Sequence, residues 1–262
     1  MDIIASKDNS KIKYVRSLYA RKNRDTDFVV EGIKFVKEAI NENVNIKFIL
    51  IAEGEKEKAE FSDLIEIIKK GKTEYYFCDD NIFNYASETV SAQGVLAVVS
   101  KIKYKEESIF NDCCLIILCD RIQDPGNLGT IIRTADAFGP AAVILTKGCV
   151  DAFNSKVIRA AAGALFRVPI IPSDIEHGII DIVKASGFKV ISSVVNSPFS
   201  FDAIEKSKKI CIVIGNEGQG ISQEILDNSD MKITIEMPGR AESLNASVAA
   251  GICIYEIRKK LL

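Results

Sequence analysis

Three short stretches of this sequence are richer in glycine, asparagine and acidic residues than a simple connection between elements requires. They span residues 120–129, 215–220 and 236–245. Glycine lets a backbone come close to a ligand, while asparagine and glutamate side chains supply directed hydrogen bonds. These residue types in three separate stretches predict a site for a nucleotide-like ligand.

The common nucleotide-binding fingerprints do not fit these stretches. A dinucleotide site needs G-x-G-x-x-G after the first strand of a domain, with an acidic residue about 20 positions later. Residues 126–129 lack the first glycine pair, and residues 215–220 follow a late strand. The sequence also lacks G-x-x-x-x-G-K-[ST]. A nicotinamide-dependent oxidoreductase stays as a rival, which a calorimetric test of cofactor binding would separate.

Arg133 stands out because small and apolar residues surround it in the predicted helix 130–138. One interpretation is structural, with the guanidinium paired to Asp136 three positions later. The alternative is a guanidinium directed into a ligand crevice. The sequence leaves both interpretations open.

The polar turn before the last helix also admits a structural interpretation. Ser243 and Asn245 are residue types preferred at helix N-caps, where a side-chain oxygen accepts a hydrogen bond from a free backbone amide. One cap needs one such residue, whereas this turn also offers Glu242 and Ser247. The excess favours a second role for some of them.

The last helix itself carries an apolar stripe, made of Leu244, Val248, Ile252 and Tyr255. Small residues fill much of the range 246–251 beside this stripe. Small side chains let a helix press closely against other backbone. We therefore expect this helix to lie deep in the core or in an interface.

The elements that must position these residues alternate between strand and helix. In the second half of the chain the pattern predicts strands over 115–119, 142–146, 189–194, 210–214 and 232–236, and helices over 130–138, 153–162 and 221–227. Such an order is typical of a parallel α/β sheet, which binds ligands at the carboxyl ends of its strands. The first half predicts a smaller α/β domain, with strands over 28–32, 47–52, 75–78 and 94–100.

Four segments follow from this pattern. We predict a basic N-terminal arm over residues 1–27, a small domain over 28–100, a hydrophilic linker over 101–112 and the parallel-sheet domain over 113–262. Residues 1–24 hold seven Lys or Arg against two Asp. They could neutralise phosphates as an arm, or form the solvated face of an amphipathic helix with Ile12, Val15, Leu18 and Tyr19 inward.

Composition indicates an ordinary globular protein, with 47% hydrophobic and 27% charged residues. No apolar run approaches the roughly 18 to 20 residues of a spanning helix, and no signal peptide is recognisable, so we expect a cytoplasmic protein. The seven cysteines lack paired metal-ligand spacing and predict reduced, buried thiols without a metal site. The only histidine, His177, lies in a polar stretch and is expected at the surface.

Taken together, the three polar stretches resemble the motifs of SpoU-type (TrmH-like) RNA ribose methyltransferases of the SPOUT class. The first motif is N-x-x-x-x-x-R-T-A from Asn127 to Arg133 and beyond, the second is I-G-N-E-G-Q-G-I over 214–221, and the third is M-P-G-R-A-E-S-L-N-A-S-V-A over 237–249. All three stand in the family's order and at similar spacings. The region 28–100, with V-E-G at 30–32 and Q-G-V-L-A at 93–97, resembles the ribosomal-protein-like substrate-binding domain that many members carry in front.

The resemblance implies S-adenosylmethionine bound in a trefoil knot of the C-terminal domain, a homodimer packed through the knotted regions, and no metal. The catalytic group that it implies is Asn127, Arg133, Glu217, Ser243 and Asn245. The cofactor-binding residues that it implies are Gly215, Asn216, Ile235, Met237 and Leu244. The implied RNA contacts are Glu31, Gly32, Lys156 and Arg159.

The function implied is methyl transfer to a ribose 2′-hydroxyl of RNA. We expect ribosomal RNA because of the front domain, with transfer RNA as the alternative substrate. A rival from another class is a non-catalytic RNA-binding protein on the same fold, against which the intact Arg133, Glu217 and Asn245 argue.

The chemistry sets the role expected of Arg133. A ribose hydroxyl is a poor nucleophile, so it must be aligned with the methyl group and its proton removed or shared. The family view makes this arginine the base, but a guanidinium that loses its proton only above about pH 12 is a weak base. We expect Arg133 to clamp the adjacent phosphate and stabilise the developing alkoxide, with Ser243 and Asn245 orienting it. The final proton acceptor stays open.

Overall fold

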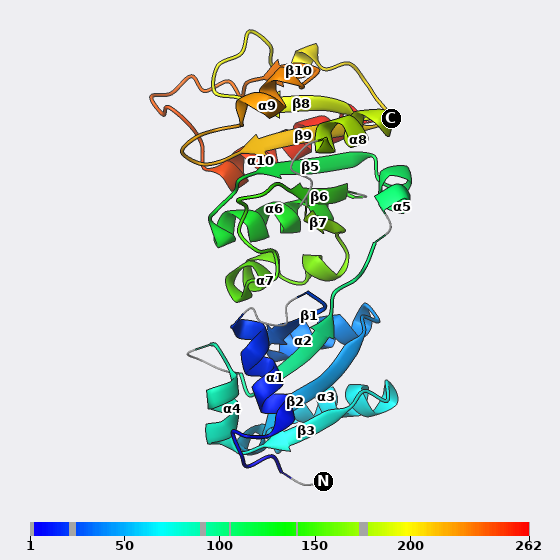
Figure 1. Ribbon diagram of the computed structural model, residues 1–262, viewed down its shortest axis with the longest axis vertical. Coiled ribbons are helices and arrows are strands. Elements are labelled where there is room, and N and C mark those ends of the chain that lie inside the picture. The colour runs from blue at the N-terminus through cyan, green and yellow to red at the C-terminus, as the bar shows by residue number, and fades with distance from the viewer. Residues whose placement is uncertain are drawn as a thin grey trace. The chain divides into compact units, whose positions relative to one another are not determined.

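The computed structural model describes residues 3–20, 25–89, 93–104, 106–139, 141–172 and 178–261. The chain divides into two compact units, Met1–Lys103 and Tyr104–Leu262, each with its own sheet (Figure 1). In the described part of the chain, no helix is long and apolar enough to cross a membrane. His177, and the basic residues Arg21, Lys22 and Arg24, lie outside the described residues.

The N-terminal unit is a four-stranded sheet covered by helices. Its elements are α1 (Ser10–Tyr19), β1 (Asp27–Glu31), α2 (Ile33–Asn41), β2 (Ile46–Ala52), α3 (Ala59–Lys70), β3 (Tyr75–Cys78), α4 (Asp80–Ala86) and β4 (Val95–Ser100). The strand order is β1-β4-β2-β3, in which β4 runs antiparallel to β1 and β2, and β3 runs parallel to β2. Helices α1 and α4 share one core cluster with alternate strand residues, while α2 and α3 pack on each other and α2 lies against β1 and β4.

Helix α1 bears on both interpretations of the basic N-terminus. Ile12, Val15 and Leu18 are buried in the core, and the side chain of Asn9 caps the helix by accepting from the Lys11 amide. Residues 10–19 therefore form an amphipathic helix whose apolar side packs in the core of the unit, and a phosphate-neutralising role of its basic residues stays a prediction. The apolar residues at helical spacing decide how this segment folds, because their burial stabilises the helix against the core and the basic residues can stay in solvent.

The C-terminal unit contains a six-stranded parallel sheet in the order β10-β8-β9-β5-β6-β7. Its elements are α5 (Glu106–Asp112), β5 (Leu115–Asp120), α6 (Pro125–Ala137), β6 (Ala141–Leu145), α7 (Ser155–Ala161), β7 (Ile170–Pro172), α8 (Ile179–Ala185), β8 (Lys189–Ser193), β9 (Ile210–Gly215), α9 (Gln223–Asp227), β10 (Met231–Ile233) and α10 (Ala246–Arg258). The predicted parallel α/β sheet is confirmed, and the trefoil knot stays a prediction.

Helices cover both faces of this sheet, so its central strands are buried throughout. Residues of α5, α8 and α9 join one hydrophobic cluster with alternate residues of β5, β6, β8 and β9. Helices α6 and α10 pack on each other and on strands β6 and β9 respectively, and α7 packs on α6. Gly129 permits the last contact, because a Cβ there would lie 2.4 Å from the Cβ of Ala160.

Several boundaries differ from those predicted. Helix α5 occupies most of the predicted linker 101–112 and buries Ile109 and Phe110. Strand β7 and helix α8 were not predicted. Helix α6 begins five residues earlier than expected, at Pro125, because Asp124 accepts from the Asn127 amide as N-cap and proline suits the first helical turn.

Candidate functional site

A cavity of about 560 Å³ opens at the carboxyl ends of β8 and β9. Strand pairing brings these ends together, since β9 runs parallel to β5 up to the pair Asp120 and Gly215, and β8 lies on its other side. The cavity is lined by Ser193, Val194, Val195, Ile214, Gly215, Asn216, Glu217, Gly218, Gln219, Gly220, Ile221, Leu226, Thr234, Ile235, Met237, Glu242, Ser243, Leu244, Ala246 and Ala249. Five predicted cofactor residues, together with Glu217 and Ser243, lie in this lining.

The loop 215–220 is closed on itself and has room only for glycine at its start. The backbones of Asn216 and Gly220 exchange two hydrogen bonds, of 3.0 and 2.9 Å. The Asn216 side-chain oxygen also accepts from the amides of Gly218 and Gln219, both at 2.9 Å. A Cβ on Gly215 would lie 2.4 Å from the carbonyl carbon of Gly220, so any side chain there forces the loop open.

Arg121 joins this loop to the ends of β5 and β6. Its guanidinium donates to the side chain of Gln219 at 2.7 Å, to the carbonyl of Gly220 at 3.2 Å and to the neighbouring Asp120 carboxylate. Its carbonyl accepts from the Asn216 amide group at 2.8 Å. Its backbone holds the left-handed conformation at φ 57°, which is strained for a residue with a Cβ.

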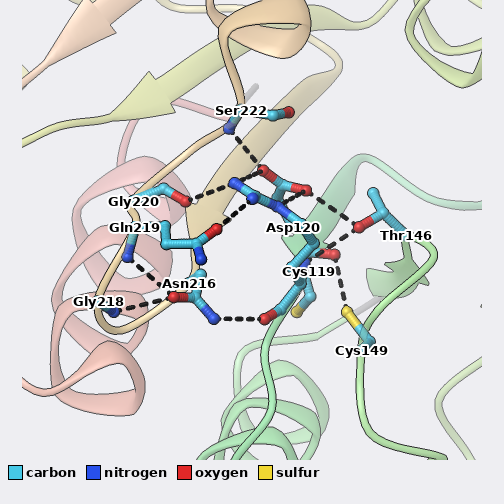
Figure 2. Close-up of polar contacts among 10 residues, drawn as sticks. Cys119, Asp120, Thr146, Cys149, Asn216, Gly218, Gln219, Gly220 and Ser222 are labelled. Carbon is cyan, nitrogen blue, oxygen red and sulfur yellow. Dashed lines mark hydrogen bonds and ion pairs between the residues drawn. The ribbon is translucent and has the colours of Figure 1, made fainter.

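The Asp120 carboxylate anchors the same junction from inside the protein (Figure 2). It is buried and accepts from the Ser222 amide at 2.7 Å and from the Thr146 hydroxyl at 3.1 Å. A buried carboxylate needs such donors, because an unpaired one is strongly destabilising. Asp120 and Arg121 together connect the end of β5 to Thr146 after β6 and to the loop after β9, which no local sequence pattern indicates.

Asn127 connects two of the predicted stretches. Its side-chain amide donates to a Glu217 carboxylate oxygen at 2.8 Å, and its side-chain oxygen accepts from the Asn245 amide at 2.9 Å. Asn245 is at the same time the N-cap of α10, since its own oxygen accepts from the Ser247 amide at 3.0 Å and the Val248 amide at 3.3 Å. The structure thus brings three members of the predicted catalytic group into one hydrogen-bonded chain.

Arg133 lies apart from this chain, on the exposed side of α6. In the described part of the protein no hydrogen bond or ion pair involves its guanidinium, and it does not line the cavity. The structural interpretation of Arg133 is wrong, because Asp136 is held by Arg167 through bonds of 2.8 to 3.1 Å. A cation left without a protein partner is available to a ligand.

The predicted RNA contacts fall into two kinds. Lys156 and Arg159 are exposed on α7, as a phosphate contact requires. Gly32 is buried at φ 104°, with its amide bonded to the Val95 carbonyl. Glu31 accepts from the hydroxyls of Tyr19, Ser87 and Thr89 and from the Glu88 amide. Glu31 and Gly32 therefore fix residues 87–89 and the start of β4, and a direct RNA contact by either stays a prediction.

The thiols near the site are not poised for nucleophilic chemistry. Burial raises the pKa of Cys119 well above its ordinary range, and burial also raises the pKa of Cys149, although backbone amides partly oppose it there. Burial raises the pKa of Cys253 to about 11. These thiols stay protonated at neutral pH and act as small apolar side chains. The described residues contain no group of three or more His, Cys, Asp or Glu that could hold a metal ion.

The cavity has the properties that a sulfonium cofactor requires. Its volume lies in the range of about 300 to 1,000 Å³ of ordinary ligand sites. Its described lining carries two carboxylates, Glu217 and Glu242, and no basic side chain, which suits a positively charged ligand. Sequence reasoning did not assign Glu242, Thr234 or the residues Val194 and Val195 that follow β8. Only the polar excess before α10 pointed to Glu242.

Comparison with known protein families gives two matches along the chain. Residues 114–255 match the SpoU rRNA Methylase family, and residues 9–97 match the MRM3-like substrate binding domain. The two matches fall in the C-terminal and N-terminal units respectively.

Individual relatives match over nearly the whole chain. The 23S rRNA (guanosine(2553)-2′-O)-methyltransferase RlmP of Bacillus subtilis is 33% identical over 98% of this chain and all of that protein. The structure of an AdoMet-bound rRNA methyltransferase from Sinorhizobium meliloti superposes with a TM-score of 0.84 at 28% identity, covering 100% of this chain and 98% of the other. The SpoU methyltransferase AviRb from Streptomyces viridochromogenes shares the fold, with a TM-score of 0.85 at 24% identity. The superposition covers 96% of this chain and 97% of the other.

Proposed function

This chain belongs to the SpoU rRNA methylase family, and from that membership we propose that it methylates a ribose 2′-hydroxyl of ribosomal RNA with S-adenosylmethionine. The observation that carries the proposal is the cavity at the ends of β8 and β9, where residues from the second and third motifs meet. The rRNA activity named for the Bacillus subtilis relative supports the choice of substrate. Transfer RNA remains the alternative substrate.

The cavity residues would hold the cofactor mainly through backbone groups and small side chains. Gly215, Asn216, Ile235, Met237 and Leu244 are assigned to this role, because all five line the cavity. S-adenosylmethionine supplies an activated methyl group when bound. Glu217 and Glu242 place negative charge in the same cavity, which would favour the cationic cofactor over its neutral product.

The remaining motif residues would position the acceptor. The bonds that join Glu217, Asn127 and Asn245 fix the start of α10 against the loop after β9, so that Ser243 stays at the cavity rim. The exposed Arg133 guanidinium would clamp a backbone phosphate and stabilise negative charge on the attacking oxygen. Lys156 and Arg159, exposed on the adjoining α7, would contact neighbouring phosphates.

The proposal includes a homodimer packed through the knotted region. Its support is the outer face of α10, where Val248 is 51% and Tyr255 52% exposed although both are large and apolar. The opposite face of the helix, with Ala250, Cys253 and Ile257, already fills the core. The predicted stripe is thus not the core face, which favours the interface interpretation. An rRNA substrate would place the protein in the cytoplasm.

A methylation assay tests the proposed activity. Ribosomal RNA from cells that lack this gene should accept a labelled methyl group from S-adenosylmethionine, and mapping should locate it at one ribose 2′-hydroxyl. Transfer RNA from the same cells is the matched comparison. A protein that binds S-adenosylmethionine and RNA but methylates neither would be the non-catalytic rival.

Arg133 provides the sharpest test of the assigned roles. Arg133→Ala should leave cofactor affinity within a few fold and lower the single-turnover rate by about 100- to 1000-fold, as for loss of one charge-stabilising donor. Arg133→Lys should restore little, because an ammonium lacks the planar two-pronged donor. Calorimetry for the cofactor, melting temperature and single-turnover rate separate this outcome from misfolding. A well-folded Arg133→Ala protein with full activity would refute the role.

A further inference from the structure

Helices α1 and α4 of the N-terminal unit pack together, and basic side chains of α1 and of the segment before it lie over aromatic rings of α4 and β3. Tyr85 of α4 is 42% exposed, with the Lys7 ammonium 4.7 Å and the Arg16 guanidinium 5.2 Å from its ring centroid. The Lys11 ammonium lies 4.3 Å from the ring centroid of Tyr76 on β3. We call these five residues the α1 cation–aromatic face.

Positive charge is concentrated on this face. Residues 3–20 carry four basic residues and one acidic residue, whereas the whole chain has a net charge of −2. Of the nearby carboxylates, Asp8 pairs with Lys13 at 2.8 Å and Asp79 caps α4, while Glu74 accepts from the Tyr76 hydroxyl at 2.9 Å and keeps its negative charge. Lys7 and Arg16, which both lie over the Tyr85 ring, are the cations that an anionic ligand would meet there.

The face is held by rigid structure. The amide of Ile4 donates to the Phe77 carbonyl at 2.9 Å, and the Asp79 amide donates to the Ile4 carbonyl at 3.0 Å, which ties the segment before α1 to the end of β3. Helix α1 is fixed by its buried apolar side and its cap. Such a preorganised face loses little conformational entropy when a ligand binds.

We propose that the α1 cation–aromatic face binds a single-stranded segment of RNA, with one base stacked on Tyr85 and the adjoining phosphates on Lys7 and Arg16. Only an unpaired base can expose its plane to a tyrosine ring, and guanidinium planes stack bases as well. This proposal rests on the proposed RNA substrate. It specifies which part of that RNA the N-terminal unit recognises, namely a loop or an unpaired strand. It is separate from Lys156, Arg159 and Arg133, which lie in the other unit.

The full-length protein and three probes test the proposal. The probes are a short single-stranded RNA of mixed sequence, the same RNA annealed to its complement, and inorganic polyphosphate, which has charge but no bases. Tyr85→Leu should weaken binding of the single strand by about 5- to 150-fold, the usual effect of losing one stacked base. Its affinity for the duplex and for polyphosphate should stay unchanged, and Tyr85→Phe should bind the single strand like the wild type.

Loss of Lys7 and Arg16 should change the salt dependence of RNA binding. Lys7→Ala with Arg16→Ala should reduce the slope of log affinity against log salt by about 1.4 for the single strand, or about 0.7 for each phosphate that is no longer neutralised. The charge-matched control is Lys69→Ala with Lys70→Ala, two exposed lysines at the end of α3, which should leave the slope unchanged.

Cofactor calorimetry on every variant keeps the two proposals apart. Cofactor affinity should not change in any of them, because all the substitutions lie outside the C-terminal unit. Equal single-strand affinity in Tyr85→Leu and wild type would overturn the stacking surface while leaving the methyltransferase proposal intact. An equal drop in affinity for single strand, duplex and polyphosphate would also overturn it. A wild-type protein that binds no RNA at all would remove both proposals.

Discussion

Arg121 should act as a positioning residue: it does not contact the cofactor, but its replacement should weaken cofactor binding. Arg121→Ala removes the guanidinium bonds to Gln219 and Gly220 and keeps the strained backbone, whereas Arg121→Gly removes the same bonds and relieves the strain. A bond from a charged donor contributes about 1.5 to 3 kcal/mol. Since the arginine side chain is 30% exposed, we take the lower end, about 1.5 kcal/mol, for each of the two bonds, and expect both variants to destabilise the closed conformation of loop 215–220 by about 3 kcal/mol in total.

Two measurements follow from these magnitudes. Cofactor affinity by calorimetry should fall about 10-fold or more in both variants, because about 1.4 kcal/mol corresponds to a factor of ten. In denaturant unfolding, Arg121→Gly should exceed Arg121→Ala in stability by about 0.5 to 1 kcal/mol. This difference is the left-handed strain of about 1 to 2 kcal/mol, reduced by the extra freedom that glycine gives the unfolded chain, about 0.4 to 1 kcal/mol.

A matched control separates positioning from general stability. Arg167, 34% exposed, makes a comparable pair in the same unit, but its partner Asp136 lies outside the cavity lining, whereas the partners Gln219 and Gly220 of Arg121 belong to it. Arg167→Ala should therefore lower the free energy of unfolding and leave cofactor affinity unchanged. Wild-type cofactor affinity in Arg121→Ala, or an equal loss in Arg167→Ala, would refute the reasoning.

Two further predictions concern the N-terminal unit and the dimer. Burial alone raises the pKa of Glu31, but bonds from the Glu88 amide and from Thr89, Tyr19 and Ser87 outweigh it, so the pKa is lowered from 4.5. The ionised carboxylate stabilises the fold above pH 4.5, and this stabilisation is lost as the pH falls through the pKa of Glu31 in the folded protein. The difference in free energy of unfolding between wild type and Glu31→Gln should therefore shrink in acid. A difference that does not change with pH would contradict the prediction. For the dimer, Val248→Glu should halve the mass measured by light scattering at micromolar concentration, because dimer formation would then bury an unpaired carboxylate on α10. A monomeric wild type would count against the interface.

The sequence could predict two of the loops that line the cavity, 215–220 and 236–245, whereas the third predicted loop, 120–129, contributes no residue to the lining. Buried strands that alternate with helices form a parallel sheet, and the carboxyl ends of its strands lie at one edge. Glycine at 215 was informative for a physical reason, since the loop returns so close that a Cβ would lie 2.4 Å from backbone. Local residue types therefore indicated that the stretch 215–220 lies at a ligand site, and the family resemblance assigned Gly215, Asn216 and Glu217 within it.

Contacts between distant residues could not be predicted in the same way. Arg121 and Gln219 are 98 positions apart, and neither type is unusual in a loop. The outer and inner faces of α10 were also ambiguous, because apolar residues surround that helix and only packing decides which side is core. Helix α1 shows the opposite case, where three apolar residues at helical spacing fix a helix that also carries three basic residues, Lys11, Lys13 and Arg16.

The turn before α10 shows why a structural role and a functional role need not exclude each other. A carboxamide has an acceptor and a donor at separate atoms. In Asn245 the oxygen caps the helix through the Ser247 amide while the nitrogen donates to Asn127, which in turn holds Glu217. Serine could cap but holds its single donor on the capping atom, and aspartate has no donor at neutral pH. Asparagine is thus a cap residue that can also connect the start of α10, through Asn127, to the Glu217 carboxylate in the cavity lining. This second bond is a physical reason for an asparagine, and not only a simple cap, in this turn.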